Sequence, residues 1–435
     1  MELLALLLFL SIFLLILYGF PVAFTLGGIS ILYAICFLDA SAFSALPPRI
    51  MGVMSNYVLL AVPLFVYMGV MLEKSGLAES LLETMAMLFG KVKGGLAISV
   101  VIVGTLLAAS TGIVGATVIT MGLISLPTML KRGYQPELAT GTIASSGTLG
   151  QIIPPSVVLV LLGSVLNVSV GDLFAAALLP GILLVGVYII YIAIVARIYP
   201  ERAPVISKEE IAAFRQDDFA WKVIKVFLLP LLLIVAVLGS IFAGIASPTE
   251  AAAVGALGAT LLTILQGKFN LSILKSVMRE TTHLTSMVFW ILLGATTFSF
   301  VFRELGGDRY LIELIENANL SATAFLILVM IVVFIAGFFI DFIEIIFIIV
   351  PVVAPIFIQY DIDLIWIGIL LALNLQTSFL SPPFGFALFY LKGVAPAGIT
   401  TQHLYRGIIP FVIIQLIFLA IVIFFPEVIY VFLEK

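Results

Sequence analysis

Charge is what this sequence has least of. Of its 435 residues only 10% are charged, whereas 63% are hydrophobic, and the mean hydropathy is +1.30. A water-soluble domain usually carries about a quarter charged residues, so this composition excludes an ordinary soluble protein. The single cysteine, Cys36, excludes a disulfide framework and any chemistry that needs a CxxC motif.

Motifs for catalysis are lacking as well. There is no GxxxxGK[ST] loop, which excludes ATP hydrolysis of the P-loop type. The only histidines are His283 and His403, and no HExxH zinc motif occurs. The string LGGDRY (305–310) is only loosely similar to the GxGD of intramembrane aspartyl proteases, and its Asp308 falls in a polar loop at the end of a predicted span. We therefore expect neither an enzyme nor a cofactor.

Long hydrophobic runs are what the sequence does contain. At about 20 residues per membrane span, ten spans are predicted, near 3–18, 20–38, 57–73, 137–166, 174–197, 225–245, 248–266, 283–302, 364–391 and 407–432. Two further stretches, 96–130 and 322–358, are too long for one span and too short for two spans with a loop. Both are predicted to be re-entrant helical hairpins. The first run lacks the basic start of a signal peptide, so we expect a retained span there.

The basic residues predict the orientation in the membrane. If the polar segment 199–224 is cytoplasmic, sixteen of the 20 lysines and arginines fall on the cytoplasmic side, and only Arg49, Arg303, Arg309 and Lys435 face outward. Cytoplasmic loops carry an excess of lysine and arginine, and the opposite orientation would invert that bias. Both termini are therefore predicted to lie outside the cytoplasm.

Two double prolines recur at a fixed distance along the chain. They lie in GTLGQIIPPSVVLVLLG (147–163) and NLQTSFLSPPFGFALFYLKG (374–393), with Pro154 and Pro382 228 residues apart. Pro127 and Pro355 have the same offset, which indicates a duplication. Each half holds five spans and one hairpin, and an odd number of crossings inverts the second copy. The predicted domains are a first inverted repeat (1–198), a cytoplasmic linker that only connects (199–224), and a second inverted repeat (225–435).

The double proline that begins at Pro154 interrupts the predicted span 137–166, and the one that begins at Pro382 interrupts the predicted span 364–391. Irregular backbone at membrane depth is tolerated only where it is buried in protein or lines a cavity. Matching breaks in two halves of a chain point to the binding site of a transporter. A broken helix exposes carbonyl groups before the break and N–H groups after it. Carbonyl and hydroxyl oxygens suit Na⁺, whereas N–H groups suit a carboxylate.

Small polar residues gather at the two breaks and at the tips of the two hairpins. The first break holds Ser145, Ser146, Gly147, Thr148, Gly150 and Gln151, and the second holds Asn374, Gln376, Thr377, Ser378 and Ser381. The first tip holds Ser110, Thr111, Gly112 and Gly115, and the second holds Gly337, Asp341 and Glu344. These side chains are candidate ligands for an ion or a substrate. In the alternative, the hydroxyl groups only donate to carbonyl groups of their own helices.

Two charged residues have two interpretations each. A carboxylate inside an apolar hairpin costs several kcal/mol unless it is paired or faces a cavity, so Asp341 is a candidate for contact with the ion or the substrate. Alternatively, Asp341 caps a helix at the tip. Arg303, at the end of a span, either guides an anion or only extends its side chain toward the membrane surface.

The first hairpin and both double-proline motifs resemble one family over essentially the whole chain. The segments STGIVGATVITMGLISLPTMLKRGY, GTLGQIIPPSVVLVLLG and NLQTSFLSPPFGFALFYLKGVAP are similar to the large membrane subunit (DctM type) of tripartite ATP-independent periplasmic (TRAP) transporters. The resemblance implies a bacterial or archaeal inner-membrane importer of an organic anion that is driven by Na⁺. It also implies two partners, a small four-span membrane subunit and a periplasmic substrate-binding protein, and an elevator-type mechanism. Nucleic acid is not an expected partner.

The resemblance also implies where the ions bind. The implied sodium-binding residues are Ser110, Thr111, Gly112, Gly147, Thr148, Gly150, Pro154, Gly337, Asp341, Asn374, Gln376, Thr377, Ser378 and Ser381. From the residues themselves, the predicted substrate-binding residues are Ser145, Ser146, Ser156, Asp341 and Arg303. Two alternatives remain, a self-sufficient sodium-coupled dicarboxylate carrier of the same superfamily and a membrane scaffold without transport activity. Irregular backbone at the bilayer midplane argues against a scaffold.

Overall fold

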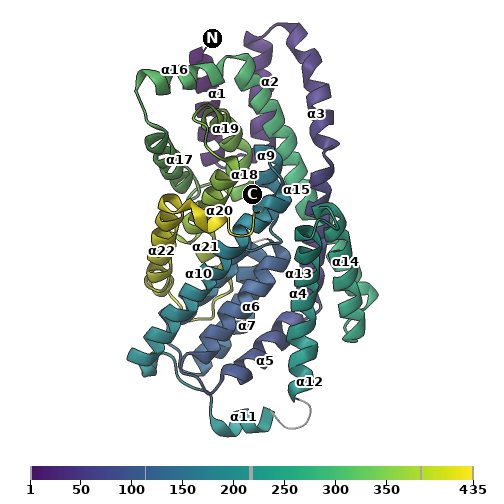
Figure 1. The fold of residues 1–435 in the computed structure, drawn as a ribbon, viewed down its shortest axis with the longest axis vertical. Helices are drawn as coiled ribbons and strands as arrows, with labels where there is room; N and C mark the ends of the chain where they lie inside the picture. Colours follow the sequence, from purple (N-terminus) through teal and green to yellow (C-terminus); the bar gives the residue numbers. More distant parts are fainter. Residues whose placement is uncertain (1, 113, 215–218, 383–384, 434–435) are drawn as a thin grey trace.

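The described chain forms an elongated bundle of helices (Figure 1). The computed structural model describes residues 2–112, 114–214, 219–382 and 385–433, and all regular elements in these ranges are helical. The all-α fold expected from the hydrophobic runs is confirmed.

Before the linker, the helices are α1 (Glu2–Leu17), α2 (Val22–Phe37), α3 (Leu46–Met54), α4 (Ala61–Lys74), α5 (Leu77–Phe89), α6 (Gly95–Thr111), α7 (Val114–Lys131), α8 (Pro136–Thr148), α9 (Val157–Leu166) and α10 (Val170–Ile198). The linker contains α11 (Lys208–Phe214) and α12 (Phe219–Val223). After it follow α13 (Leu229–Phe242), α14 (Pro248–Leu265), α15 (Leu271–Glu304), α16 (Gly307–Asn317), α17 (Ala322–Ala336), α18 (Phe342–Ile348), α19 (Val350–Gln359), α20 (Leu364–Leu380), α21 (Phe386–Val394) and α22 (Thr401–Phe424).

Seven helices of the described chain are long and apolar enough to cross a membrane. They are Tyr57–Lys74, Val114–Lys131, Val170–Ile198, Trp221–Phe242, Pro248–Leu265, Leu271–Glu304 and Thr401–Phe424, and an eighth results if α18 and α19, which meet at 50°, count as one span. The other expected spans consist of shorter apolar helices, because Pro21 precedes α2 and the two double-proline segments divide 137–166 and 364–391.

Two spans have ends that differ from the prediction. The span expected at 283–302 begins at Leu271, where Asn270 caps α15 by accepting a hydrogen bond from the Ile273 N–H at 2.8 Å. The first three turns of α15 are polar, so hydropathy alone did not reveal them. The span expected to reach 432 ends at Phe424, before Pro426 starts a separate short turn. In both cases a local backbone signal, not hydrophobicity, sets the end of the helix.

Contacts divide most of the helices into two bodies. In the α4–α15 body, α15 packs against α2, α3 and α4, and α14 packs against α4 and α13. In the α8–α20 body, α8 packs against α6, α7 and α22, and α20 packs against α9, α17 and α22. The bodies meet where α4 contacts α6 and where α15 contacts α18. Both double-proline segments belong to the α8–α20 body.

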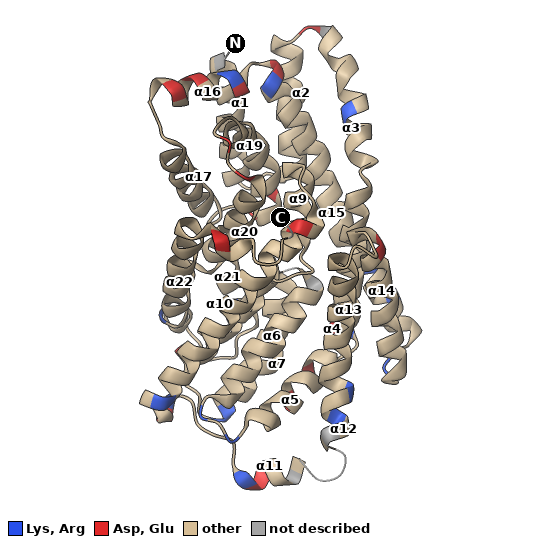
Figure 2. Ribbon diagram, viewed as in Figure 1, with Lys and Arg blue, Asp and Glu red and all other residues tan. Residues whose placement is uncertain are grey.

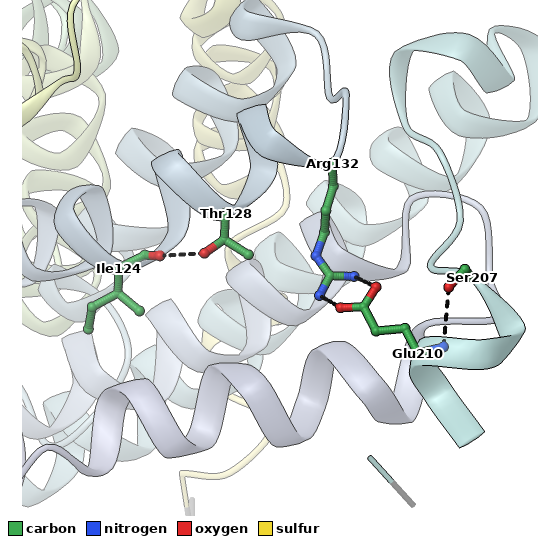
Figure 3. A network of polar contacts seen from close by, with 5 residues as sticks. All are labelled: Ile124, Thr128, Arg132, Ser207 and Glu210. Atoms are coloured by element: carbon green, nitrogen blue, oxygen red, sulfur yellow. Dashed lines mark hydrogen bonds and ion pairs between the residues drawn. The ribbon is translucent and has the colours of Figure 1, made fainter. Parts of the chain in front are cut away.

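The linker does more than connect the halves, which corrects the prediction for 199–224. The Gly94 N–H donates to the Ala203 carbonyl at 3.1 Å, and the Ile206 N–H donates to the Gly90 carbonyl at 3.0 Å. The Ala203 and Ile206 side chains are buried. Near the end of α7, two nitrogens of Arg132 lie 2.5 and 3.3 Å from the two carboxylate oxygens of Glu210 in α11 (Figure 3). The linker is therefore packed where α6 begins and where α7 ends.

Basic residues gather at one end of the molecule. In Figure 2 most of the blue segments lie at the end formed by α5, α11 and α12, whereas few lie at the opposite end near α3 and α16. This distribution is the asymmetry on which the predicted orientation depends.

Close backbone contact between α8 and α22 gives a first prediction. A methyl group added at Gly141 would lie 2.1 Å from the carbonyl oxygen of Gly407. Backbone cannot give way as a flexible side chain can, so Gly141→Ala should lower the free energy of unfolding by about 3 kcal/mol, the upper end for overpacking. Thermal unfolding of the purified protein in detergent measures the effect. Gly186→Ala in α10 is the matched control, because its methyl group would meet no atom within 4 Å. Equal stability of the two variants would contradict the prediction.

Candidate functional site: two broken helices and two hairpin tips

The first break separates α8 from α9. After Thr148 the chain makes a short 3-10 turn over Leu149–Gln151 and then runs irregularly as far as Ser156. The Ser156 hydroxyl donates to the Gln151 carbonyl at 2.8 Å and accepts from the Leu159 N–H at 3.4 Å. Ser156 therefore begins α9 and also fixes the path of the break. The first turn of a helix has N–H groups without partners inside the helix, and such groups can bind an anion.

The tip of the α6–α7 pair lies directly on this break. A methyl group at Gly150 would be 2.1 Å from the Ala108 carbonyl oxygen, and one at Gly112 would be 2.9 Å from the Val157 side chain. One at Gly104 would be 2.5 Å from the Ser146 hydroxyl. Only glycine permits these approaches, so the sequence places glycine where the tip and the break touch. The Ser110 hydroxyl, buried at this tip, donates to the Leu107 carbonyl at 2.8 Å.

The second break separates α20 from α21, and the α17–α18 tip lies on it. A methyl group at Gly337 would be 2.1 Å from the Ser378 hydroxyl. The Asn374 amide donates to the Met330 carbonyl in α17 at 2.7 Å. Ser381 ends α20 by donating to the Thr377 carbonyl at 2.9 Å. Gly337 and Ser378 repeat the relation of Gly104 and Ser146 in the first half, a glycine of the hairpin against a serine of the broken helix.

Some predicted positions lie outside the described part of the chain. They are Pro383 and Phe384 of the second break and the side chain of Thr111 at the first tip.

The first break lies against the broken helix of the second half. The helix α20 contacts both the 3-10 turn of the first break and α9. Each half-helix that follows a break also contacts the hairpin of the other half, α9 with α18 and α21 with α7. The four polar segments predicted from the sequence are thus assembled within one body.

The hydroxyl groups of this region are buried and donate to their own helices. Their donors and acceptors are Ser145 to Thr142 (3.1 Å), Ser146 to Ile143 (3.0 Å), Thr148 to Ser145 (2.9 Å), Thr377 to Leu373 (2.8 Å) and Ser378 to Leu375 (2.8 Å). The back-bonding alternative is therefore seen in the structure. It does not exclude ion binding, because a hydroxyl that donates its proton still has lone pairs for a cation.

Among the buried glutamines of the described structure with no hydrogen-bond partner for either amide atom, which include Gln415 of α22, two lie at the breaks. Gln151 and Gln376, one in each break, have no exposed surface, and neither amide oxygen nor nitrogen has a hydrogen-bond partner. An unsatisfied buried polar group costs about 1–3 kcal/mol, so one such glutamine at each break points to a ligand there. Gln376 belongs to the sodium set predicted from the sequence, whereas Gln151 does not. Gln151 could have been added to the predicted set, because it lies in the same double-proline motif as Gly150 and Pro154.

Asp341 caps the N-terminus of α18, which is one of the two interpretations predicted from the sequence. Its carboxylate accepts from the Phe342 N–H at 2.8 Å, and Glu344 accepts from the Asp341 N–H at 3.1 Å. The cap uses only part of the acceptor capacity of a carboxylate. Asp341 is partly exposed, so it also faces open space at the second tip. The cap and a contact with the ion or the substrate are therefore compatible.

Tyr390 of α21 was not predicted from the sequence. A methyl group at Gly115 of the first hairpin would lie 3.1 Å from its ring. Its side chain is 39% exposed. No sequence spacing relates Tyr390 to either hairpin, because the contacts come from the packing of one half on the other.

The structure does not bring Arg303 to the breaks. It lies in the last turn of α15, where its Nε is 3.2 Å from Oδ2 of Asp308. Asp308, expected in a loop, lies in the first turn of α16. Burial raises the pKa of its carboxyl group, and the neighbouring Arg303 guanidinium acts in the opposite direction.

The donor set of the breaks fits an alkali cation better than a transition metal. In the described ranges no group of three or more His, Cys, Asp and Glu side chains could hold a metal ion. What the breaks offer is hydroxyl, amide and backbone oxygen, the ligands that suit Na⁺.

The family of the chain follows from comparison with known proteins. The model of the family "Tripartite ATP-independent periplasmic transporter, DctM component" matches residues 9–428. The chain belongs to this family. The predicted resemblance to TRAP large subunits is confirmed, and the TRAP transporters are a family of transporters, not of enzymes.

Relatives agree with this assignment, and a solved structure has a similar fold. The C4-dicarboxylate TRAP transporter large permease protein DctM of Vibrio cholerae is 32% identical over 97% of this chain and 95% of its own length. The sialic acid TRAP transporter large permease protein SiaM of the same organism is 28% identical over 94% and 93%. The YdaH transporter of Alcanivorax borkumensis has a similar fold, with a TM-score of 0.64, 14% identity, and coverage of 96% of this chain and 99% of that one.

Proposed function

We propose that this TRAP large permease subunit imports a small organic anion with one or more carboxylate groups, and that Na⁺ drives the import. The observation that carries the proposal is the pair of breaks, which hold unsatisfied Gln151 and Gln376 among buried hydroxyl groups. Each break and its hairpin tip would hold Na⁺, and the N–H ends of α9 and α21 would receive the carboxylate. The name of the 32% identical relative makes C4-dicarboxylates the first substrates to test.

The proposal includes an elevator-type movement between inverted repeats. The two bodies meet where α4 contacts α6 and α9 and where α15 contacts α18, and both broken helices belong to one body. We propose that the α8–α20 body carries the anion across while the α4–α15 body stays fixed in the membrane. The partners would be a small four-span membrane subunit and a periplasmic binding protein that delivers the anion. The protein would lie in the inner membrane with both termini in the periplasm, the orientation favoured by the basic end of the molecule.

Uptake into vesicles tests the function. The permease, reconstituted with its small subunit and a candidate binding protein, is expected to accumulate a C4-dicarboxylate when an inward Na⁺ gradient is imposed and ATP is absent. Uptake is expected to fall to background when K⁺ replaces Na⁺ on the outside. Full uptake in K⁺ medium with only a proton gradient would contradict sodium coupling.

Omission of one component separates the proposal from its alternatives. Without the binding protein, uptake is expected to fall to background. Undiminished uptake would instead identify a self-sufficient carrier. A folded protein that transports neither C4-dicarboxylates nor sialic acid with any binding protein would support a scaffold role.

A further inference from the structure

A cavity of about 490 Å³ lies away from the breaks, where the two bodies meet. The α4–α15 body contributes Arg49 from α3, Asn56 from the short segment after α3, and Ser299 and Arg303 from α15. The other body contributes the end of α9 and the apolar face of α18 and α19, including Phe347. Small-molecule sites typically occupy about 300–1,000 Å³, so this cavity has room for a small organic anion.

The lining of the cavity carries positive charge only. It contains Arg49 and Arg303 and no aspartate or glutamate. The Arg49 guanidinium lies 4.9 Å from the centre of the Phe300 ring, and no ion pair to it occurs in the described structure. Stacking on an aromatic ring fixes the plane of a guanidinium and leaves its N–H edge free for a carboxylate. Arg303 is partly neutralised by Asp308 at 3.2 Å, but a guanidinium has five donors and this pair uses few of them.

Neutral polar groups complete the lining and connect the two bodies. The Asn56 amide nitrogen donates to the Ser164 hydroxyl at 3.0 Å, which joins the segment after α3 to α9. The Asn56 amide oxygen accepts from the Val58 N–H at 3.0 Å. The Ser299 hydroxyl also borders the cavity. An anion bound here would therefore contact both bodies at once.

Two helices lead from the cavity toward the candidate transport site. Phe347 lines the cavity and Asp341 begins the same short helix, α18, six residues earlier. At 1.5 Å per residue this separation is about 9 Å along the helix axis. Ser164 and Ser156 stand in the same relation at the two ends of α9, about 12 Å apart. The cavity is thus within about one substrate length of the polar segments at the breaks.

We propose that this cavity is an entry site for the organic anion, in which Arg49 and Arg303 hold a carboxylate before the anion reaches the breaks. Arg49 belongs to α3, and Arg303 ends α15 just before α16. Figure 2 shows α3 and α16 at the end opposite to the basic end, which the proposed orientation places outside the cytoplasm. Two cations without a lining carboxylate attract anions and raise their local concentration. The identity of the anion rests on the proposed function, whereas the positive charge of the cavity follows from its lining alone.

Thiol labelling measures the charge of the cavity without any transport. Ser299→Cys, in a chain with Cys36→Ser, places one thiol in the lining. We expect the negatively charged sulfonatoethyl methanethiosulfonate to react faster there than the positively charged trimethylammonium analogue. Arg49→Gln should reduce the ratio of the two rates about tenfold, as removal of one charge at a distance of several ångström predicts. Arg49→Lys should keep the ratio, and Arg309→Gln, an exposed arginine of α16 that does not line the cavity, should leave it unchanged. An unchanged ratio in the Arg49→Gln variant would overturn the proposal.

Protection and uptake then test what the cavity binds. Succinate is expected to slow the labelling of the introduced thiol by the anionic reagent in the protein that keeps Arg49 and not in the Arg49→Gln variant. In the uptake assay, Arg49→Gln should raise KM about tenfold and leave kcat within about twofold. An unchanged KM would overturn the entry role. Protection by phosphatidylglycerol vesicles but not by succinate would also overturn it, in favour of a lipid site. If succinate protects but no anion is transported, the proposed function fails while the anion site stands.

Discussion

Replacing Asp341 with asparagine is expected to abolish sodium-driven uptake while the protein remains folded and inserted. Asparagine is as good a helix cap as aspartate, and its amide oxygen can accept from the Phe342 N–H as the carboxylate does at 2.8 Å. The substitution therefore removes the charge and keeps the cap. We expect the rate of uptake to fall at least about 100-fold, which corresponds to about 2.8 kcal/mol at 1.4 kcal/mol per factor of ten.

The control for Asp341 is a second capping carboxylate that lies elsewhere. Asp363 caps α20 by accepting from the Ile365 N–H at 2.8 Å, but it lies in the turn between α19 and α20, away from both breaks and tips. Asp363→Asn should leave uptake within about twofold. Amounts in the membrane and elution from size exclusion should match the parent protein in both variants. Normal uptake in the Asp341→Asn protein would reduce Asp341 to a structural cap.

Local rules made much of this site predictable from the sequence. Proline and glycine act on the backbone where they stand, so the interruptions between α8 and α9 and between α20 and α21 could be located from the residues alone. The serines and threonines beside them could be assigned to the site because a broken helix leaves carbonyl groups and N–H groups without partners. The hydrophobic runs likewise predicted an all-helical membrane protein, since each span must be apolar over its length.

Contacts between distant segments were beyond the sequence. Nothing in the spacing of Gly337 and Ser378 shows that a methyl group on one would overlap the hydroxyl of the other. Tyr390 lies beside Gly115 of the first hairpin only because α21 packs against α7. The docking of Ile206 on Gly90 was hidden for a related reason, because a polar segment looks like a connector until its few apolar residues find a surface. Such long-range packing requires the assembled fold.

The largest effect on sodium binding is expected from the two unsatisfied glutamines. Gln151→Met and Gln376→Met keep the length of each side chain and remove its amide. If the amides serve only as ion ligands, folding without Na⁺ should gain about 1–3 kcal/mol from the loss of an unsatisfied buried group. Na⁺ should stabilise the folded variants less than the parent protein. A ligand at 100 times its Kd adds about 2.7 kcal/mol to the free energy of unfolding, and a site with a higher Kd adds less. We expect the Na⁺ concentration for half-maximal uptake to rise at least about tenfold in each variant.

Thermal unfolding with and without Na⁺, in choline-balanced buffer, separates this prediction from a structural role. An amide held by internal water would behave in the opposite way, because methionine would strand that water, lower the melting temperature in choline and leave the Na⁺-induced shift intact. Gln415→Met is the matched control, since Gln415 is a buried glutamine of α22 outside both breaks. The Gln415→Met variant should show the same Na⁺-induced rise in melting temperature as the parent protein. The two break variants should differ from it, because Gln151 and Gln376 each lie at a break and Gln415 does not.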